Sequence, residues 1–305
     1  CHINDLPDCV KSQVRLFADD CLLYRPIRTF EDHLELQNDL SELEKWASKW
    51  GMRFNSKKCY ILSVKQKSQY FYRLNNDILE QVEENPYLGV LISEDLKWTK
   101  HIANITKRAS QTLGFLRRNL RTCPTDCRRT AYLSLVRPTV EYGATVWDPY
   151  LKKDINRLER VQNLAARFIT KDYRSREEGC VTNMLRSHEI PSLESRRKEA
   201  RLGTMYKVIH AQLPALPPTR FLTPAKARRQ IKKPKHLNDY IADLSSLDTL
   251  FYNHTMCFSV PSSKTEQYKH SFFVQTVLDW NHLDKCVAGS VTYEVFRANL
   301  SRVID

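Results

Sequence analysis

The sequence predicts an α+β fold in which short antiparallel strands with a packed helix come first and a mainly helical region follows. Residues 1–95 alternate short apolar runs with turn residues, and one helical stripe interrupts them between Leu36 and Trp50. From Leu96 onward the apolar residues recur at helical spacing. With 305 residues and 42% hydrophobic content, the chain can bury a core, and we expect two or three domains.

The charge balance favours a polyanionic partner. Lys and Arg number 48 against 35 Asp and Glu, which gives a net charge of +13. A membrane surface competes for such charge, but no apolar run approaches the roughly 18 to 20 residues that span a bilayer, and no signal peptide opens the chain. We therefore expect no membrane partner and an intracellular location, in the nucleus or the cytoplasm. Nine irregularly spaced cysteines fit reduced thiols.

Zinc ligation by cysteine and histidine is not indicated. Cys123 and Cys127 have no histidine close behind them, and His254 with Cys257 lacks a second pair.

Two adjacent carboxylates lie within the stretch Val14–Tyr24. The apolar runs on either side predict a strand, a tight turn and a returning strand, which leaves Asp19 and Asp20 at the tip. Adjacent ionised carboxylates repel, so such a pair needs a raised pKa or a cation, and Mg²⁺ and Mn²⁺ prefer oxygen ligands. The alternative is an ordinary acidic turn.

The next element is a helix that braces the strand pair. Thr29 and Asp32 resemble a capping box, and Gly51 ends the helix. Its apolar face consists of Leu36, Leu40, Leu43, Ala47 and Trp50.

The strand pattern then returns in short stretches: Met52–Asn55, Cys59–Val64, Tyr70–Leu74, Ile78–Leu79 and Tyr87–Ile92. Asn75, Asn76 and Asp77 predict a hairpin turn, because Asn and Asp tolerate the left-handed region. Gly89 permits a close backbone approach or packs as a core glycine, and both interpretations stay open.

Helices follow from Leu96. The first has the apolar face Ile102, Ile105, Ala109, Leu113 and Leu116. Pro124 suits a first helical turn, and the pattern then continues until Pro138 interrupts it. Two more helices are predicted, over Asp154–Thr170 and Ser192–His210.

The cations of these helices are candidates for contacts with phosphate groups, which need charge but little sequence information. They are Lys107, Arg108, Arg117, Arg118, Arg128 and Arg129. The alternative is a solvated helix surface.

The C-terminal third begins with a break in the pattern. Leu213–His236 contains prolines followed by a basic run, which predicts a mobile linker. The tail from Leu237 is rich in aromatic residues and contains two amphipathic helices, Ser271–His282 and Val291–Leu300. We expect the aromatic residues to form a small core, with base stacking as the functional alternative.

Several motifs together resemble a known family. Phe17-Ala18-Asp19-Asp20 resembles the catalytic aspartate box of reverse transcriptases, and Ile3-Asn4-Asp5-Leu6-Pro7 before it is similar to non-LTR (LINE-type) retrotransposon polymerases. Further matching segments follow in order: Phe54-Asn55 with Lys58-Cys59, Tyr87-Leu88-Gly89-Val90, Ser134-Leu135-Val136-Arg137-Pro138, Glu141-Tyr142, Leu158-Glu159-Arg160-Val161-Gln162, Met205-Tyr206-Lys207, Ser271-Phe272-Phe273 and Asp279-Trp280-Asn281.

The resemblance implies a domain order. Residues 1–95 would be a truncated polymerase palm, 96–212 a thumb-like helical domain, 213–236 a basic linker and 237–305 a small C-terminal domain.

It also implies RNA-directed DNA synthesis, with Mg²⁺ or Mn²⁺ at Asp19 and Asp20 and a catalytic lysine, Lys58, near the incoming triphosphate. The Lys58 ammonium would neutralise or protonate the departing pyrophosphate, and the alternative is a solvated surface lysine. The implied partners are an RNA template and a DNA primer, with dNTP if the missing palm is supplied.

In the family, the fingers and the first palm aspartate precede the matching region. Because Asp19 and Asp20 supply one side of a two-metal clamp, we expect this chain alone to be inactive. The competing hypotheses are a non-catalytic nucleic-acid-binding remnant or domesticated module, and a purely structural scaffold.

Overall fold

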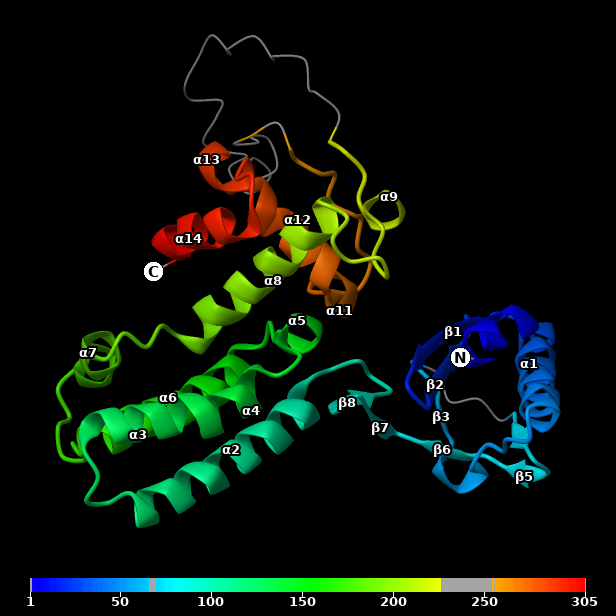
Figure 1. Cartoon of the computed structure of the whole chain (residues 1–305), viewed down its shortest axis with the longest axis horizontal. Coiled ribbons are helices and arrows are strands. Elements are labelled where there is room, and N and C mark those ends of the chain that lie inside the picture. The colour runs from blue at the N-terminus through cyan, green and yellow to red at the C-terminus, as the bar shows by residue number, and fades with distance from the viewer. Residues whose placement is uncertain (1, 66–69, 226–253, 255, 305) are drawn as a thin grey trace, which may run out of the picture. The chain divides into compact units, whose positions relative to one another are not determined.

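The computed structural model describes residues 2–65, 70–225, 254 and 256–304, and the chain divides into two compact units, residues 1–97 and 98–305. Figure 1 shows small two-stranded sheets in the first unit and helices in the second. The α+β class is therefore confirmed. In the part of the chain that the structure describes, every helix is too short or too polar to cross a lipid bilayer.

The first unit combines one long helix with short strands. Its elements are a 3₁₀ helix at His2–Cys9, β1 (Gln13–Phe17), β2 (Asp20–Tyr24), α1 (Phe30–Lys49), a 3₁₀ turn at Ser56–Lys58, β3 (Tyr60–Leu62), β4 (Arg73–Leu74), β5 (Asp77–Ile78), β6 (Glu80–Val82), β7 (Glu84–Tyr87) and β8 (Val90–Ser93).

Helix α1 has the predicted apolar stripe and cap. The Thr29 amide donates to Asp32 Oδ2 at 3.0 Å, as a capping box requires, and Gly51 follows the helix at a φ of +65°. Leu40, Leu43 and Ala47 are buried between the β1–β2 hairpin and the β4 region. The stripe is thus confirmed as core packing.

The strand predictions between Met52 and Val64 are partly wrong. Residues 52–55 form no strand, and the chain instead enters a 3₁₀ turn before β3. β3 pairs with β6 in parallel, whereas we expected antiparallel strands. A parallel pair needs a crossover connection, and the intervening β4–β5 hairpin lies within it. That hairpin turns at Asn75 and Asn76, both left-handed, as predicted.

The predicted strand Tyr87–Ile92 is instead a hairpin. β7 and β8 pair antiparallel around a two-residue turn, in which Leu88 has a φ of +48° and Gly89 a φ of +79°. Two left-handed residues in succession are the mark of a type I′ turn. Gly89 thus supplies a positive φ at a turn, which neither of our two interpretations anticipated.

The second unit is helical. Its elements are α2 (Thr99–Asn119), α3 (Thr125–Ala131), a π-helix at Tyr132–Val136, α4 (Arg137–Glu141), α5 (Ala144–Trp147), α6 (Lys152–Thr170), α7 (Cys180–Ser187), α8 (Leu193–Ile209), α9 (Pro218–Phe221), α11 (Glu266–Lys269), α12 (Phe272–Asn281), α13 (Lys285–Ala288) and α14 (Tyr293–Ile304).

Helices α2, α4 and α6 lie side by side in Figure 1, and their facing residues form a core. Ile102, Ala109 and Leu158 are fully buried there, and the predicted apolar face of α2 is confirmed. The prediction that Pro138 interrupts the helix is wrong, because the helical backbone continues through it. A π-helical turn precedes it, and such a turn widens the backbone where the proline ring would otherwise clash.

Aromatic residues form the core of the C-terminal part. Trp280 of α12 and Phe296 of α14 are fully buried against α8, which supports the core interpretation over base stacking for these two rings. The Trp280 indole donates to the Met256 carbonyl, and the Asn281 amide bonds both backbone groups of Phe258. The Asp-Trp-Asn motif thus fastens residues 256–258 to α12.

The structure describes the predicted linker as far as Ala225, and this part is not the mobile segment that the sequence predicted. Residues 213–225 include α9, and Leu222 is 7% exposed in the same core. The basic run beyond it, from Lys226 to His236, lies outside the described residues.

Acidification is expected to destabilise the second unit through His101. This histidine is 3% exposed beside Trp147, and burial lowers its pKa from 6.5, with Arg108 adding to the effect. The unfolded chain therefore binds a proton near pH 6.5 and the folded chain only at lower pH, so the free energy of unfolding falls as pH drops below 6.5. Each unit of pKa depression is worth about 1.4 kcal/mol.

Urea unfolding at pH 7.5 and 5.5 measures this loss. His101→Gln should show a smaller loss on acidification than the unsubstituted chain, and His282→Gln, at an exposed site, should show the same loss as the unsubstituted chain. Equal pH dependence in all three proteins would contradict the assignment.

Candidate functional site

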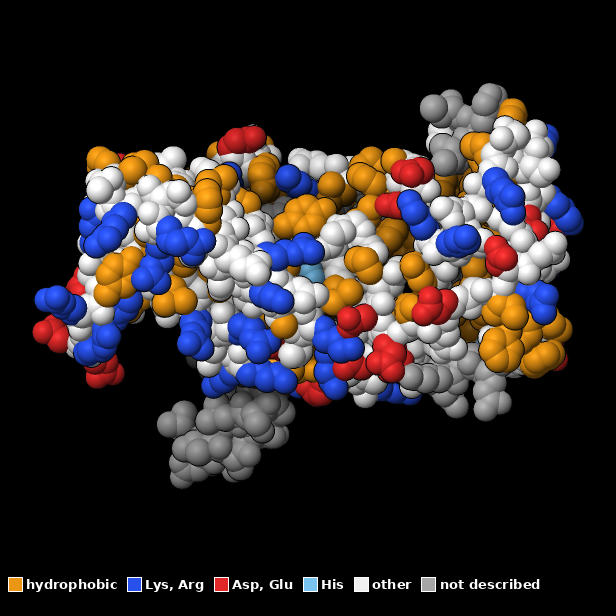
Figure 2. Space-filling view, turned by 90° about the horizontal axis from the view of Figure 1, so that it is seen from below, with side chains coloured by type: hydrophobic (Ala, Val, Ile, Leu, Met, Phe, Trp, Pro, Cys, Tyr) orange, Lys and Arg blue, Asp and Glu red, His pale blue; other side chains and the backbone are white. Residues whose placement is uncertain are grey.

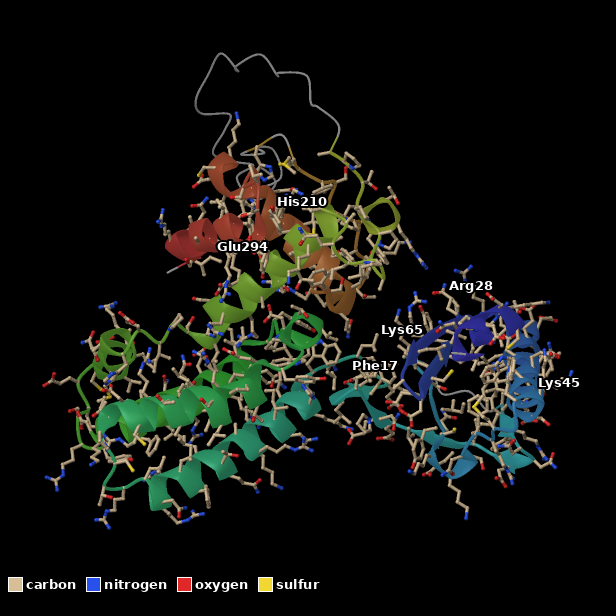
Figure 3. The ribbon with its side chains drawn as sticks, viewed as in Figure 1. Phe17, Arg28, Lys45, Lys65, His210 and Glu294 are labelled. Carbon is tan, nitrogen blue, oxygen red and sulfur yellow. The ribbon has the colours of Figure 1, made fainter. Side chains whose placement is uncertain are left out.

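The two aspartates lie at the tip of the β1–β2 hairpin. Phe17 pairs with Asp20, and Ala18 and Asp19 form the turn between them. Ala18 has a φ of +52°, in a region that favours glycine, so the turn holds a strained residue next to the acids. The Asp19 and Asp20 side chains are both exposed. Phe17, labelled in Figure 3, marks the end of β1 that carries the turn.

Buried contacts at the other end hold the hairpin in place. The Asp39 carboxylate of α1 accepts hydrogen bonds from the amides of Lys11 at 2.9 Å and Ser12 at 2.8 Å, just before β1. Val14 of β1 packs into a core with Leu43 of α1. The turn therefore extends from a braced base.

Asp20 has neighbours from distant parts of the chain. Burial raises the pKa of the Tyr87 hydroxyl, and the Asp20 carboxylate adds to this effect, so β7 brings Tyr87 near the hairpin. Burial raises the pKa of the Cys21 thiol to about 11, and Cys59 contributes. Because Cys21 follows Asp20 and Cys59 follows Lys58, the fold brings the predicted lysine into the same region of the unit. The Lys58 side chain is exposed.

The acids at the tip do not form a closed metal site by themselves. Within residues 2–65, 70–225, 254 and 256–304, no three His, Cys, Asp or Glu side chains are grouped closely enough to hold a metal ion. Mg²⁺ is commonly bound through one or two carboxylates, with water and phosphate oxygens completing its shell. The donor set at Asp19 and Asp20 fits such a partial site.

One face of α2 carries cations near its start, its middle and its end. The sequence Thr99–Asn119 contains five Lys and Arg residues and no Asp or Glu. Exposed side chains recur along this face at helical spacing: Lys100, Asn104, Lys107, Arg108, Gln111, Phe115 and Arg118. Figure 2, which views the molecule from the α2 side, shows Lys and Arg gathered over the helical unit. We call these seven residues the α2 face.

The structure divides the predicted phosphate contacts into exposed and internal residues. Lys107, Arg108 and Arg118 are exposed on the α2 face. Arg117 is also exposed but lies on the other side of α2, 4.8 Å from the centre of the Tyr173 ring.

Arg128 requires a correction. It is 3% exposed, and its Nε donates to the Ile169 carbonyl at 3.0 Å, so it stabilises the helix packing and has no route to a phosphate. Arg129 is half-buried and donates to the His188 carbonyl at 2.9 Å.

Two exposed aromatic residues near these cations were not identified from the sequence. Phe115 is 57% exposed and Tyr173 is 39% exposed. The exposure of Phe115 could have been predicted from the sequence. Phe115 does not fit the spacing of the apolar face from Ile102 to Leu116, and helical spacing places it on the same side as Arg108 and Arg118.

Comparisons with known proteins identify relatives of the chain. The chain is 30% identical over 173 residues to the probable RNA-directed DNA polymerase from transposon BS of Drosophila melanogaster. The matched stretch covers 54% of this chain and 19% of the relative. It is 27% identical over 168 residues to the probable RNA-directed DNA polymerase from transposon X-element of the same species. That match covers 52% of this chain and 18% of the relative.

A third relative is the RNA-directed DNA polymerase from mobile element jockey of Drosophila melanogaster, 26% identical over 142 residues, or 44% of this chain and 15% of the relative. The matched region thus amounts to less than a fifth of the length of these curated relatives. No family model matches the chain, and no solved structure matches it either. The similarities confirm the resemblance carried by the motifs, and the chain is a homologue of the RNA-directed DNA polymerases of Drosophila non-LTR retrotransposons.

Proposed function

We propose that this chain is a C-terminal part of an RNA-directed DNA polymerase of a non-LTR retrotransposon. In this proposal, residues 1–97 contribute strands of the palm, and the helices from α2 to α8 form a thumb-like region. The observation that carries it is the exposed pair Asp19 and Asp20 at a braced hairpin tip, within the Phe-Ala-Asp-Asp box.

The tip residues are assigned to metal binding. Asp19 and Asp20 would hold Mg²⁺ or Mn²⁺ through their exposed carboxylates. When bound, such ions stabilise the attacking and leaving oxygens of phosphoryl transfer. Lys58 would bring an ammonium to the departing pyrophosphate, as its exposed position permits.

The remaining metal ligands have no source among the described residues. In a polymerase they would come from a further palm carboxylate and from the nucleotide phosphates, so we expect the isolated chain not to extend a primer. Polymerisation, the RNA template, the DNA primer and dNTP are thus assigned to the complete enzyme.

Primer extension tests the assignment. The chain is supplied with a poly(A) template, an oligo(dT) primer, dTTP and Mn²⁺, alone and together with the polymerase region that precedes the matching segment in a relative. Extension is expected only in the mixture, and Asp19→Asn or Asp20→Asn should abolish it. Glu80→Gln, on exposed β6, is the matched control and should retain extension. Extension that survives both aspartate substitutions would contradict the metal role.

A non-catalytic nucleic-acid-binding module is the second candidate, because the α2 face provides cations that need no metal site. It predicts strong salt-dependent binding of nucleic acid with no extension in any mixture. A structural scaffold predicts no binding even at low salt.

A further inference from the structure

The loop between α6 and α7 is held in one conformation by its own polar contacts. Arg167 of α6 donates to the carbonyls of Asp172 at 3.1 Å and Ser175 at 3.0 Å. Asp172 accepts hydrogen bonds from the amides of Arg174 and Ser175, both at 3.0 Å, and from the Ser175 hydroxyl. These bonds lower the pKa of Asp172 to about 2, so its carboxylate stays ionised and the loop stays fastened at physiological pH.

This ordered loop presents an aromatic ring among cations. Tyr173 is 39% exposed, and the Arg117 guanidinium lies over its ring at 4.8 Å from the centroid. Lys171 and Arg174 flank it in sequence, and both are exposed. The acids within five residues of Tyr173 in the sequence are Asp172, which is engaged within the loop, and Glu177 and Glu178, which immediately precede Gly179 and α7.

We propose that Tyr173 is a stacking platform for an unpaired base of single-stranded nucleic acid, whose adjoining phosphates contact Lys171 and Arg174. The proposal rests on the proposed binding of nucleic acid by this unit, and it adds a second site that selects single strands.

The chemistry of the ring favours this ligand. A base stacks on an aromatic side chain whatever its identity, because every base has a π face. The Arg117 guanidinium lies over the ring, so a base that stacks on the exposed part of Tyr173 meets an aromatic surface with a cation beside it. In a duplex each interior base has both of its faces covered by its neighbours, so Tyr173 is open to the many bases of a single strand but only to the end pairs of a duplex.

The site is separate from the α2 face. Arg117 and Phe115 are two residues apart on a helix, so their side chains point to nearly opposite sides of it. A duplex on the α2 face would therefore leave Tyr173 available for a single strand. The two surfaces make different demands, since the α2 face needs only phosphates and Tyr173 needs a base.

Binding measurements with the full chain separate these demands. The probes are a fluorescent oligo(dT) strand, an abasic strand with the same number of phosphates, and a blunt duplex. Tyr173→Ala should weaken oligo(dT) binding by about tenfold, within the range for one stacked base, while duplex binding changes by less than about twofold. On the abasic strand, Tyr173→Ala and the unsubstituted chain should bind equally.

Two variants control for ring chemistry and for lost surface area. Tyr173→Phe keeps the ring and should bind oligo(dT) like the unsubstituted chain. Tyr268→Ala removes a tyrosine that is 48% exposed on α11 and should also leave binding unchanged. Far-ultraviolet circular dichroism confirms that each variant is folded.

The remaining outcomes overturn the proposal in distinguishable ways. Equal oligo(dT) binding by Tyr173→Ala and Tyr268→Ala rejects the stacking site, as does a loss in Tyr173→Phe equal to that in Tyr173→Ala. Duplex binding without oligo(dT) binding rejects the site but leaves the proposed function intact. Binding of neither probe rejects both.

Discussion

Removing three of the four cations of the α2 face is expected to weaken duplex binding by about tenfold to a hundredfold at physiological salt, because each cation removed means one fewer released counterion. The variant carries Lys107→Gln, Arg108→Gln and Arg118→Gln, and glutamine preserves the helix propensity of α2. The slope of log affinity against log salt should fall by about 0.9 for each phosphate that the variant no longer neutralises. Fluorescence anisotropy with an RNA–DNA duplex over a series of salt concentrations measures both quantities.

The size of this effect depends on the lack of acids in α2. A cation that is already paired with a carboxylate releases less counterion on binding, and the α2 sequence places no Asp or Glu beside Lys107, Arg108 and Arg118. Lys107, Arg108 and Arg118 are all exposed, so a backbone laid along the helix can reach them together.

A second triple variant with the same change in net charge is the control. Lys45, Lys97 and Lys269 are each paired with an acid, namely Glu42 at 2.8 Å, Asp95 at 3.4 Å and Glu266 at 3.7 Å. Replacing these three by glutamine should lower affinity only slightly and leave the salt slope nearly unchanged. Equal losses in the two triple variants would show that net charge, rather than the α2 face, governs binding.

The long helices were predictable because their apolar residues are periodic. The spacing alone predicts that Leu40, Leu43 and Ala47 share one face of α1, and the structure buries all three. The same holds for Ile102, Ala109 and Leu113 on α2. Such a pattern spans several turns, so one misplaced residue does not change the prediction.

Short strands and turns were less predictable, because their conformation depends on single residues. Leu88 adopts a φ of +48°, which its side chain does not favour, and only the pairing of β7 with β8 accounts for the turn. The pairing of β3 with β6 is likewise a tertiary outcome, since two runs of three residues carry no information about strand direction.

Arg128 shows where the interpretation of charge failed. Arg128 is four residues before Tyr132 and eight before Val136, so it lies on the buried side of its own helix. Arg197 and Arg201 share the spacing of Leu193 and Met205 on α8, and they are equally buried. The position of a cation on an apolar stripe was therefore a better guide to its role than its charge.

Loss of the Asp148 carboxylate is expected to destabilise the second unit by about 3–5 kcal/mol, the usual result of removing one partner from a buried ion pair. Asp148 accepts from Arg197 Nε at 2.8 Å and from Arg201 Nε at 2.6 Å, and these arginines are 1% and 4% exposed. Asp148→Asn keeps the shape of the side chain but leaves two guanidinium groups in the core without that charge. Arg201 retains Asp279 at 3.0 Å, so most of the cost comes from Arg197.

Urea unfolding followed by tryptophan fluorescence measures the change, since Trp147 and Trp280 are buried in this unit. Glu266→Gln is the matched control. The Glu266 side chain is 64% exposed and pairs with Lys269 and His270, and such surface ion pairs contribute only about 0–1 kcal/mol to stability. A loss for Asp148→Asn no larger than for Glu266→Gln would mean that water reaches Arg197 in solution. Neither substitution touches the α2 face or Tyr173, so nucleic-acid binding by the folded fraction should be unchanged in both.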